Sequence, residues 1–504
     1  MSKRASILLA AFALGACEPS IEPVAPRPPA PPPAASTAHA AASSPAPDPL
    51  ATAPLPDPEP RFVPPSAEER RLPNGIRLLV TERHDLPIVA LRLAFAGGAD
   101  QGAPGVGSFT AAMLFQGTKK RSAIALDDDL RRLGITAEAT AEYDSIAVTA
   151  QCLPDRLPEA LAIMGDLVQS PAFAPDEVER VRSRRLTSLF NQSGKPATLV
   201  TEETLALLYP EGHPYRLPVV GDEASNKAIR VADLQAFHRD NLVPARLTIA
   251  VAGDVTMAGI APQIERVFGA WKGSAASPIA PPRPKILPGP RVTLIDQPGL
   301  SQSWVTVTAM GIARTDPSFD AVSMMNTILG GYYASRLNMN LREKHGYTYV
   351  AQSSLELRRG PGPFSASATV TREQTGAALG EMWREIARIR EELVSQEELD
   401  VARIRAIRRL PARFETDAAV AGVMSALSAE GLPLDEFATR ADRYAKLTRE
   451  DVKRAAAATL APEALRVVVV GDAKAIKAQI DALGLGEVVV KSPPRAPRPG
   501  AVVP

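Results

Sequence analysis

One stretch of the sequence is present twice, and this repeat limits the folds that the chain can adopt. Residues 232–254 align without a gap with residues 450–472, as ADLQAFHRDNLVPARLTIAVAGD and EDVKRAAAATLAPEALRVVVVGD. Each copy has the pattern of a helix, a Leu-x-Pro turn and a β-branched strand that ends at Gly-Asp. Two similar helix starts with acidic first turns also occur upstream, as PDEVERVRSRR and SQEELDVARIR. The chain is therefore predicted to contain two homologous domains.

The segments around the repeats set approximate limits for these domains. We expect one domain over residues 67–280, a proline-rich linker over 281–290 and a second domain over 291–490. In each domain, strand-like runs such as IVALRLAFAGG precede long helical stretches, and a strand comes last. Strands grouped with several helices predict an α+β fold, in which helices pack on one face of a sheet. Residues 491–504 are rich in proline and are predicted to form a disordered tail.

The N-terminus has the layout of a secretion signal. MSKRASILLAAFALGAC has basic residues, then an apolar run, then small residues before Cys17. Its Leu-Gly-Ala-Cys end resembles the bacterial lipoprotein cleavage box, which implies a signal peptide over residues 1–16 and acylation of Cys17. The alternative is an ordinary signal whose cysteine is incidental. Residues 17–66, rich in proline and alanine, are predicted to be a disordered tether. The expected location is the bacterial cell envelope, facing the periplasm or the outside.

Charge and hydropathy limit the classes of partner. The 57 Lys+Arg against 56 Asp+Glu give a formal net charge of +1, and no long basic run occurs. Nucleic acid is therefore not expected as a partner. The apolar run at the N-terminus is too short for a permanent transmembrane helix. We expect contact with the membrane through the lipid anchor only.

Four longer motifs resemble segments of one peptidase family. In chain order they are LPNGIRLLVTERHDLPIVALRLAFAGGADQGAPG, MLFQGT, HPYRLPVVGDEASNKAIRVADLQAFHRDNLVPARLTIAVAGD and LGGYYASRLNMNLREKHGYTYVAQSS. They are similar to the pitrilysin/insulinase superfamily of zinc metallopeptidases, in the branch that includes the mitochondrial processing peptidases and their bacterial relatives. The resemblance covers nearly all of residues 68–490. It implies two α+β domains, each a mostly antiparallel sheet with helices packed on it, which together form half of a clam-like peptidase chamber.

Active members of this family carry His-x-x-Glu-His on the helix that corresponds to PGVGSFTAAMLFQGT. Two such histidines share one helix face and bind one Zn²⁺, the glutamate acts as general base, and a glutamate on a later helix is the third ligand. The resemblance places these positions at Ser108, Ala111, Ala112 and Ser188. Alanine has no donor atom, and a neutral hydroxyl is a poor zinc ligand. The metal site is therefore degenerate, and we expect this chain to bind no zinc.

The rest of the sequence offers no replacement for these ligands. The chain has five histidines, and no two of them are close enough in sequence to share a helix face: His39, His84, His213, His238 and His345. Ser108 has no identifiable adjacent base that could make it a nucleophile. An active peptidase with relocated ligands is therefore the least favoured interpretation.

The second half of the chain retains more of the family pattern. SRLNMNLREKHGYTY resembles the segment by which non-catalytic partner subunits supply an arginine and a tyrosine to the active site, here Arg342 and Tyr349. A guanidinium can hold a substrate carbonyl or carboxylate, and a phenol can help to stabilise an oxyanion. The alternative is a structural ion pair between Arg342 and Glu343, with Tyr349 packed on the sheet.

The sequence thus predicts a non-catalytic subunit of a heteromeric bacterial zinc metallopeptidase. A homologous partner with an intact His-x-x-Glu-His motif would hold the zinc, while this chain would supply Arg342 and Tyr349. The expected substrates are peptides bound as an added strand along a sheet edge. The alternative is a membrane-tethered pseudopeptidase that binds peptides or acts as a scaffold.

Overall fold

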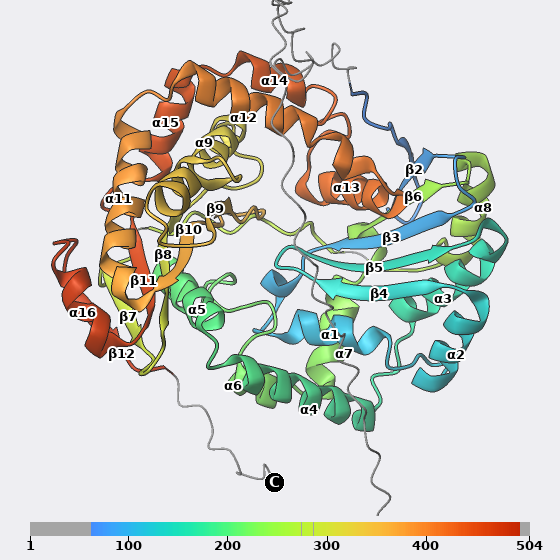
Figure 1. The fold of residues 1–504 in the computed structure, drawn as a ribbon. Helices are drawn as coiled ribbons and strands as arrows, with labels where there is room; N and C mark the ends of the chain where they lie inside the picture. Colours follow the sequence, from blue (N-terminus) through green and yellow to red (C-terminus); the bar gives the residue numbers. More distant parts are fainter. Residues whose placement is uncertain (1–61, 274, 286, 494–504) are drawn as a thin grey trace, which may run out of the picture. The chain divides into compact units, whose positions relative to one another are not determined.

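A computed structural model describes residues 62–273, 275–285 and 287–493 (Figure 1). The predicted signal peptide, Cys17 and most of the predicted tether and tail lie outside the described residues. Two six-stranded sheets, each covered by helices, form the fold. The predicted α+β class with mostly antiparallel sheets is confirmed. Every helix in the described part of the chain is too short or too polar to cross a bilayer.

The first half of the chain contributes one sheet and the helices that follow its strands. Its elements are β1 (Glu68–Arg71), β2 (Arg77–Glu82), β3 (Val89–Ala96), α1 (Val106–Leu114), α2 (Ala123–Leu133), β4 (Thr136–Ala141), β5 (Ser145–Cys152), α3 (Leu157–Gln169), α4 (Pro175–Gln192), α5 (Pro196–Leu208), α6 (Glu223–Ala228), α7 (Val231–Asn241), β6 (Leu247–Gly253) and α8 (Met257–Phe268).

The second half repeats this series with small changes. Its elements are β7 (Val292–Asp296), β8 (Gln302–Met310), α9 (Phe319–Gly330), α10 (Arg336–Asn338), a π-helical turn η4 (Met339–Lys344), β9 (Ala351–Leu355), β10 (Pro363–Thr371), α11 (Thr375–Glu391), α12 (Gln396–Arg408), α13 (Asp417–Glu430), α14 (Arg440–Lys446), α15 (Arg449–Thr459), β11 (Arg466–Gly471), α16 (Ala473–Asp481) and β12 (Val488–Lys491).

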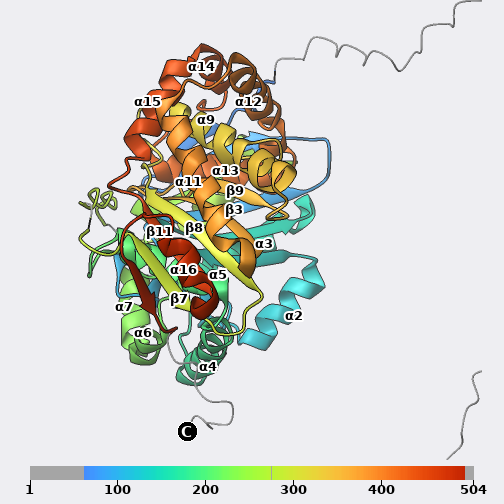
Figure 2. The same cartoon turned by 60° about the vertical axis from the view of Figure 1, so that its left-hand side comes forward.

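The two sheets share one strand order. The first runs β1-β2-β6-β3-β5-β4 and the second runs β12-β7-β11-β8-β10-β9. In both, the last strand of the repeated motif lies inside the sheet: β6 is parallel to β2 and antiparallel to β3, and β11 is parallel to β7 and antiparallel to β8. The view in Figure 2 shows β7, β8 and β11 with α16 and α11 lying in front of them. The repeat seen in the sequence therefore encodes one helix and the central strand that follows it.

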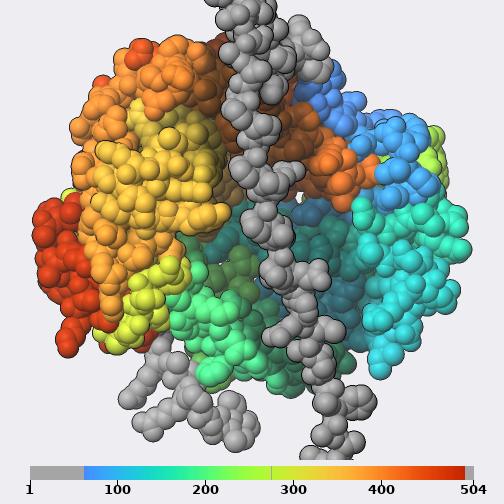
Figure 3. Space-filling view, viewed as in Figure 1, coloured from blue at the N-terminus to red at the C-terminus, as the bar shows by residue number. Residues whose placement is uncertain are grey.

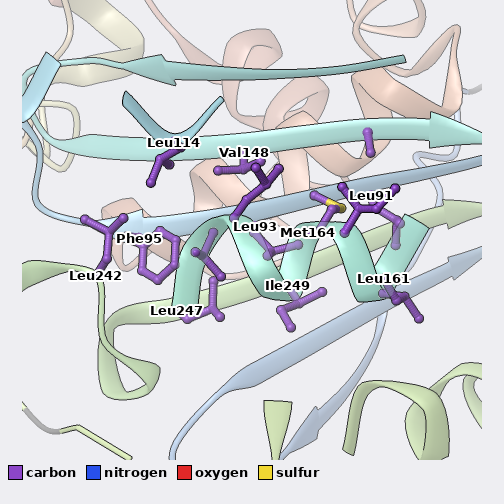
Figure 4. Packing of buried hydrophobic residues seen from close by; sticks show 14 of the residues in the cluster. Leu91, Leu93, Phe95, Leu114, Val148, Leu161, Met164, Leu242, Leu247 and Ile249 are labelled. Atoms are coloured by element: carbon purple, nitrogen blue, oxygen red, sulfur yellow. The ribbon is translucent and has the colours of Figure 1, made fainter. Parts of the chain in front are cut away.

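One face of the first sheet forms a large apolar core with the helices of its own half. Figure 4 shows β3, β5 and β6 facing α3, with aliphatic and aromatic side chains between them. The side chains labelled there are Leu91, Leu93, Phe95, Leu114, Val148, Leu161, Met164, Leu242, Leu247 and Ile249. All are 4% exposed or less, so this layer fixes the position of α1, whose Leu114 belongs to it.

The opposite face of each sheet is covered by a helix from the other half. On the first sheet, α13 packs against β3 and β6, with Ala250 and Ala252 of β6 in the same cluster as Met424 of α13. On the second sheet, α5 packs against β11 and β8, with Val468 in the same cluster as Leu199 of α5. In Figure 3 orange atoms of the second half lie against blue atoms of the first. This exchange explains why β6 and β11 are apolar at consecutive positions, because strands buried on both faces lose the polar alternation.

A buried polar junction also joins the two halves. The hydroxyl of Tyr215 donates to Asp144 Oδ1 (2.5 Å), and the backbone N–H of Arg359 donates to Asp144 Oδ2 (2.6 Å). The guanidinium of Arg359 also pairs with the buried carboxylate of Asp100, at 3.0 Å. Tyr209 donates to the carbonyl of Pro361 (2.8 Å). The turn around residue 215 and the loop around residue 360 are therefore held together by buried hydrogen bonds as well as by apolar contacts.

Candidate functional site

The helix α1 carries three of the four predicted metal-site positions. It begins after Gly105, whose φ of +83° belongs to the left-handed region that glycine adopts at little cost. A Cβ atom at Gly105 would lie 2.8 Å from the carbonyl oxygen of Val220, so only glycine allows this approach. Ser108 and Ala111 are buried, while Ala112 is half-buried. The Ser108 hydroxyl donates to the carbonyl of Val219, at 2.9 Å.

The fourth position, Ser188, lies on α4, which packs against α1. Its side chain is exposed, and its Oγ accepts a hydrogen bond from Gln192 Nε2 (2.9 Å). The structure therefore brings together the two helices that the resemblance assigns to the metal site. A side-chain hydrogen bond between these helices, however, involves a residue that was not selected from the sequence.

That residue is Arg185 of α4, one helical turn before Ser188. Its Nη2 donates to Ser108 Oγ (2.9 Å) and to the carbonyl of Val220 (2.9 Å), and lies 3.4 Å from the carbonyl of Gly105. Its Nε donates to Asn226 Oδ1 (2.7 Å). All four acceptors are neutral. The guanidinium thus joins α1, α4 and the segment that leads into α6.

The surroundings of Arg185 are largely apolar. Its guanidinium carbon lies 5.0 Å from the ring centroid of the fully buried Phe109, a cation–π distance. Burial alone lowers the pKa of Arg185 to about 10, and no nearby carboxylate opposes this change. Arg185 therefore remains charged at neutral pH as a half-buried cation, and no carboxylate pairs with it among the residues that the structure describes.

These residues do not fit a zinc ion. Ala111 and Ala112 have no donor atom, and the hydroxyl of Ser108 is already bonded to Val219 and Arg185. A fixed guanidinium next to these positions would also repel a second cation. Among the residues that the structure describes, no three His, Cys, Asp or Glu side chains are grouped as metal ligands.

The second predicted pair, Arg342 and Tyr349, is in direct contact. The Arg342 guanidinium carbon lies 4.6 Å from the ring centroid of Tyr349 and 4.3 Å from that of Tyr333. The Arg342 Nε also lies 3.4 Å from Glu343, so the ion pair considered as the alternative is present as well. The alternative for Tyr349 is wrong: it precedes β9 and is 79% exposed, so it does not pack on the sheet.

Tyr333 was not selected from the sequence. It is 55% exposed and donates its hydroxyl proton to Glu343 Oε1, at 3.0 Å. This hydrogen bond raises the pKa of Tyr333. Arg342 therefore lies between two exposed aromatic rings, which limits its side-chain freedom and leaves aromatic faces available to a ligand.

A cavity of about 570 Å³ lies next to Ser188, between the C-terminal end of α4, α5 and the segment before α6. Its apolar wall comprises Leu189, Phe190, Leu199 and Ile295. Of its carboxylates, Glu203 pairs with Lys491 (2.7 Å), and Asp222 accepts the backbone N–H of Ser225 (2.7 Å). Glu202 has no hydrogen-bond or ion-pair partner within the described part of the chain. Burial, together with the charge of Asp222, raises the pKa of Glu202.

Sequence comparison assigns both halves to models of one peptidase family. Residues 80–217 match the model described as insulinase (peptidase family M16), and residues 228–405 match the model described as peptidase M16 inactive domain. These two matches include α1, α4, Arg342 and Tyr349.

Individual relatives include bacterial and mitochondrial proteins. An uncharacterised zinc protease of Mycobacterium tuberculosis is 28% identical over 285 residues, which cover 55% of this chain and 64% of the relative. A probable mitochondrial-processing peptidase subunit beta of Arabidopsis thaliana is 24% identical over 275 residues, which cover 53% of this chain and 51% of the relative. The chain thus spans less than two thirds of the length of these relatives.

Solved structures show the same fold. A peptidase M16 inactive domain from Pseudomonas fluorescens superposes with a TM-score of 0.73 at 29% sequence identity, over 81% of this chain and 98% of that one. A protease from Helicobacter pylori superposes with a TM-score of 0.73 at 18% identity, over 81% of this chain and 100% of that one.

Proposed function

Because the chain belongs to the insulinase family, peptidase family M16, we propose that it is a non-catalytic subunit of a heteromeric bacterial zinc metallopeptidase. In this proposal a homologous partner with an intact His-x-x-Glu-His motif holds the zinc and cleaves the peptide. This chain binds part of the same substrate. The observation that carries the proposal is the contrast between the two predicted groups, since the metal-ligand positions are replaced whereas Arg342 and Tyr349 are present and in contact.

The geometry around Arg342 supports a role in substrate binding. The guanidinium can donate paired hydrogen bonds to a peptide carbonyl or carboxylate. Tyr333 and Tyr349 hold it from two sides, so less side-chain entropy is lost when a ligand binds. The exposed hydroxyl of Tyr349 can donate to a carbonyl oxygen of the same substrate.

Features of the first half also support peptide binding. The strand β4 is at the edge of its sheet, pairs only with β5 and packs next to α1. Its free side can pair with an extended peptide through main-chain hydrogen bonds. The cavity beside Ser188 has an apolar wall and the unpartnered carboxylate of Glu202. It suits a side chain with an aliphatic stem and a positive head, such as lysine or arginine.

The proposed setting follows from the N-terminal sequence. Cleavage before Cys17 and acylation of its thiol would attach the protein to a membrane of the bacterial envelope, with the proline-rich segment as a tether. The catalytic partner would meet this chain in the same compartment. A membrane-tethered pseudopeptidase that binds peptides without a catalytic partner is the second candidate, and the engagement of Ser108 by Arg185 favours it as much as the first.

Purification from native membranes separates these candidates. We expect the full-length chain to co-purify with a sequence-related protein that carries His-x-x-Glu-His, and the pair to cleave unfolded peptides. The chain alone should cleave nothing, and Arg342→Ala in the pair should lower kcat/KM at least tenfold, the size expected for one charge-assisted hydrogen bond. Recovery of no such partner would favour the binding module. Cleavage by the isolated chain, with one tightly bound zinc per chain, would contradict both candidates.

A further inference from the structure

Arg185 lies beside the positions that hold the metal ion in active members of the family. One nitrogen of its guanidinium has no hydrogen-bond partner among the described residues. Nε and Nη2 donate to Asn226, Ser108 and the carbonyl of Val220. Nη1, which carries two further N–H groups, has no hydrogen-bond partner among the described residues. Nη1 is not closed off from solvent, so its two N–H groups face water rather than another protein group.

Comparison of the two halves of the chain distinguishes Arg185 from arginines that occur at equivalent positions in both halves. Arg182 of α4 donates to the carbonyl of Ile229, just before α7, and Arg403 of α12 donates to the carbonyl of Leu447, just before α15. These two arginines occupy equivalent places in the two halves. Aligning α4 and α12 on them places Ala406 opposite Arg185. The repeated fold therefore forms without an arginine at this position.

The charge of Arg185 is also uncompensated. Its partners are an amide, a hydroxyl and backbone carbonyls, and no carboxylate forms an ion pair with it in the described part of the chain. A half-buried cation of this kind is stabilised by an anion that brings its own negative charge. The free Nη1 and the planar guanidinium suit a carboxylate rather than a neutral carbonyl.

We propose that Arg185 is a carboxylate-binding site of the first half, in which a fixed guanidinium takes the place of the metal ion of active relatives. The ligand class rests on the function proposed above, since the carboxylate is that of a peptide bound beside α1 and α4. Arg185 holds the carboxylate through Nη1, while Nε and Nη2 stay bonded to the protein. The carboxylate is either the C-terminus of the peptide or an acidic side chain within it.

The test is a binding measurement on the full-length chain, by fluorescence anisotropy with one labelled, otherwise uncharged peptide in three forms. The first form has a free C-terminal carboxylate, the second a C-terminal amide, and the third an amide with one internal glutamate. We expect the wild type to bind a carboxylate-bearing form about tenfold more tightly than the neutral amide, the gain expected for one charged hydrogen bond. The peptide form that binds more tightly than the neutral amide identifies which carboxylate is recognised.

Variants of neighbouring arginines provide the controls. Arg185→Met should bind all three forms equally, and Arg185→Lys should retain part of the preference because the charge remains. Arg184→Met is the matched control. Arg184 is exposed on the same helix, and within the described residues its one hydrogen bond is to Gln116 Oε1 at 3.5 Å, so its loss should leave the preference unchanged. Thermal unfolding of each variant verifies that it is folded.

The outcomes separate this inference from the proposed function. A carboxylate preference that persists in Arg185→Met, or that is absent from the wild type while the peptides still bind, overturns the carboxylate site alone. Arg342→Met should lower the affinity for all three peptide forms to the same extent, because Arg342 belongs to the other half of the proposed substrate site. If Arg342→Met binds each form as tightly as the wild type does, and the carboxylate preference of the wild type is lost in Arg185→Met, the carboxylate site is supported and the role proposed for Arg342 is contradicted.

Discussion

The two halves of the chain share a strand order but differ at the sheet edge and around the first helix. The outer strand of the first sheet is β1, which precedes β2 in sequence and is antiparallel to it. The outer strand of the second sheet is β12, which comes last and is parallel to β7. The two halves therefore share the other five strand positions of each sheet, whereas the position beside β2 or β7 is filled by a strand from the start of the first half or from the end of the second.

The exchange of α5 and α13 teaches that neither half is complete alone. Each sheet presents two apolar faces, and its own helices cover only one of them. The other face is covered by the helix that follows α4 in one half and α12 in the other. A domain of either half cut at its sequence limits would expose a sheet face of Ala, Val and Leu side chains to water, which is unfavourable by roughly 25 cal/mol per Å².

The largest effect is expected from a charge placed on an exchanged helix. Met424 of α13 is 2% exposed against the first sheet, and Leu199 of α5 is 2% exposed against the second. Met424→Asp and Leu199→Asp should each lower the free energy of unfolding by more than about 4 kcal/mol, because an unpaired carboxylate is buried. Denaturant unfolding, followed by limited proteolysis, should show that each change unfolds both halves together.

A surface change on the same helix is the control. Ala426 of α13 is exposed, and Ala426→Asp should alter the free energy of unfolding by less than about 0.5 kcal/mol. If Met424→Asp unfolds only the second half and leaves the first sheet resistant to protease, the halves are independent and the exchange does not stabilise both.

The polar junction is the next interaction to test. Asp144 accepts the hydroxyl of Tyr215 and the backbone N–H of Arg359, so Asp144→Ala leaves two buried donors without a partner. We expect a loss of about 3 kcal/mol in the free energy of unfolding, since unsatisfied buried donors are costly. Tyr215→Phe removes the hydroxyl that donates to Asp144 and accepts the backbone N–H of Gly360 (3.1 Å), and should cost about 2 kcal/mol. A loss in Asp144→Ala no larger than that in Tyr215→Phe would show that the Arg359 contact contributes no more than the Gly360 contact.

Much of the scaffold could be predicted from the sequence, because it depends on patterns that repeat. The helix, turn and strand of the duplicated motif appear as α7 with β6 and as α15 with β11. The family resemblance selected Arg342 and Tyr349, which are in contact in the structure. These features follow from local periodicity or from adjacent residues. The prediction of helices on one face of each sheet did not include the exchanged helices, because no local pattern shows which sheet α5 or α13 covers.

The chemistry around α1 was less predictable for a similar reason. In VERVRSRRLT the arginines at 180, 182, 184 and 185 look alike, and only the folded structure separates them. Arg182 contacts the carbonyl before α7, whereas Arg185 contacts Ser108. Glu202 is likewise one of two adjacent glutamates, of which only Glu203 has a lysine partner. Burial and pairing of single charges depend on contacts between elements that are distant in sequence.

A moderate loss of stability is expected when either of the two equivalent arginines, Arg182 and Arg403, is replaced. Arg182→Met removes a donor to the carbonyl of Ile229, just before α7. Arg403→Met removes a donor to the carbonyl of Leu447, just before α15. Each substitution should lower the free energy of unfolding by about 1 to 2 kcal/mol, and the two losses should be similar. Urea unfolding measures both. A difference of more than about 1 kcal/mol would show that the repeat does not use the two arginines in the same way.

The smallest effect is expected from pH, and it should arise in the first half. His213 and His238 are half-buried there, and desolvation lowers the pKa of each imidazole below its ordinary value. The Nε2 of His238 bonds the carbonyl of Val168 (2.7 Å), which a neutral ring satisfies as a donor. The unfolded chain therefore binds more protons than the folded chain between the lowered pKa values and about 6.5, so the free energy of unfolding should fall as pH drops through this range.

One histidine of the same half acts in the opposite direction. His84 is exposed and bonded to Asp254 (2.7 Å), and this hydrogen bond raises its pKa, so its contribution is present at low pH and is lost as pH rises through the raised pKa. His238→Gln keeps a donor for Val168 without a titrating group and should flatten the acid loss, whereas His84→Gln should steepen it. Thermal unfolding of both variants between pH 5 and 8 measures the two slopes. If His238→Gln leaves the slope unchanged, the acid sensitivity comes from groups other than the buried imidazole of α7, whose counterpart in α15 is Ala456.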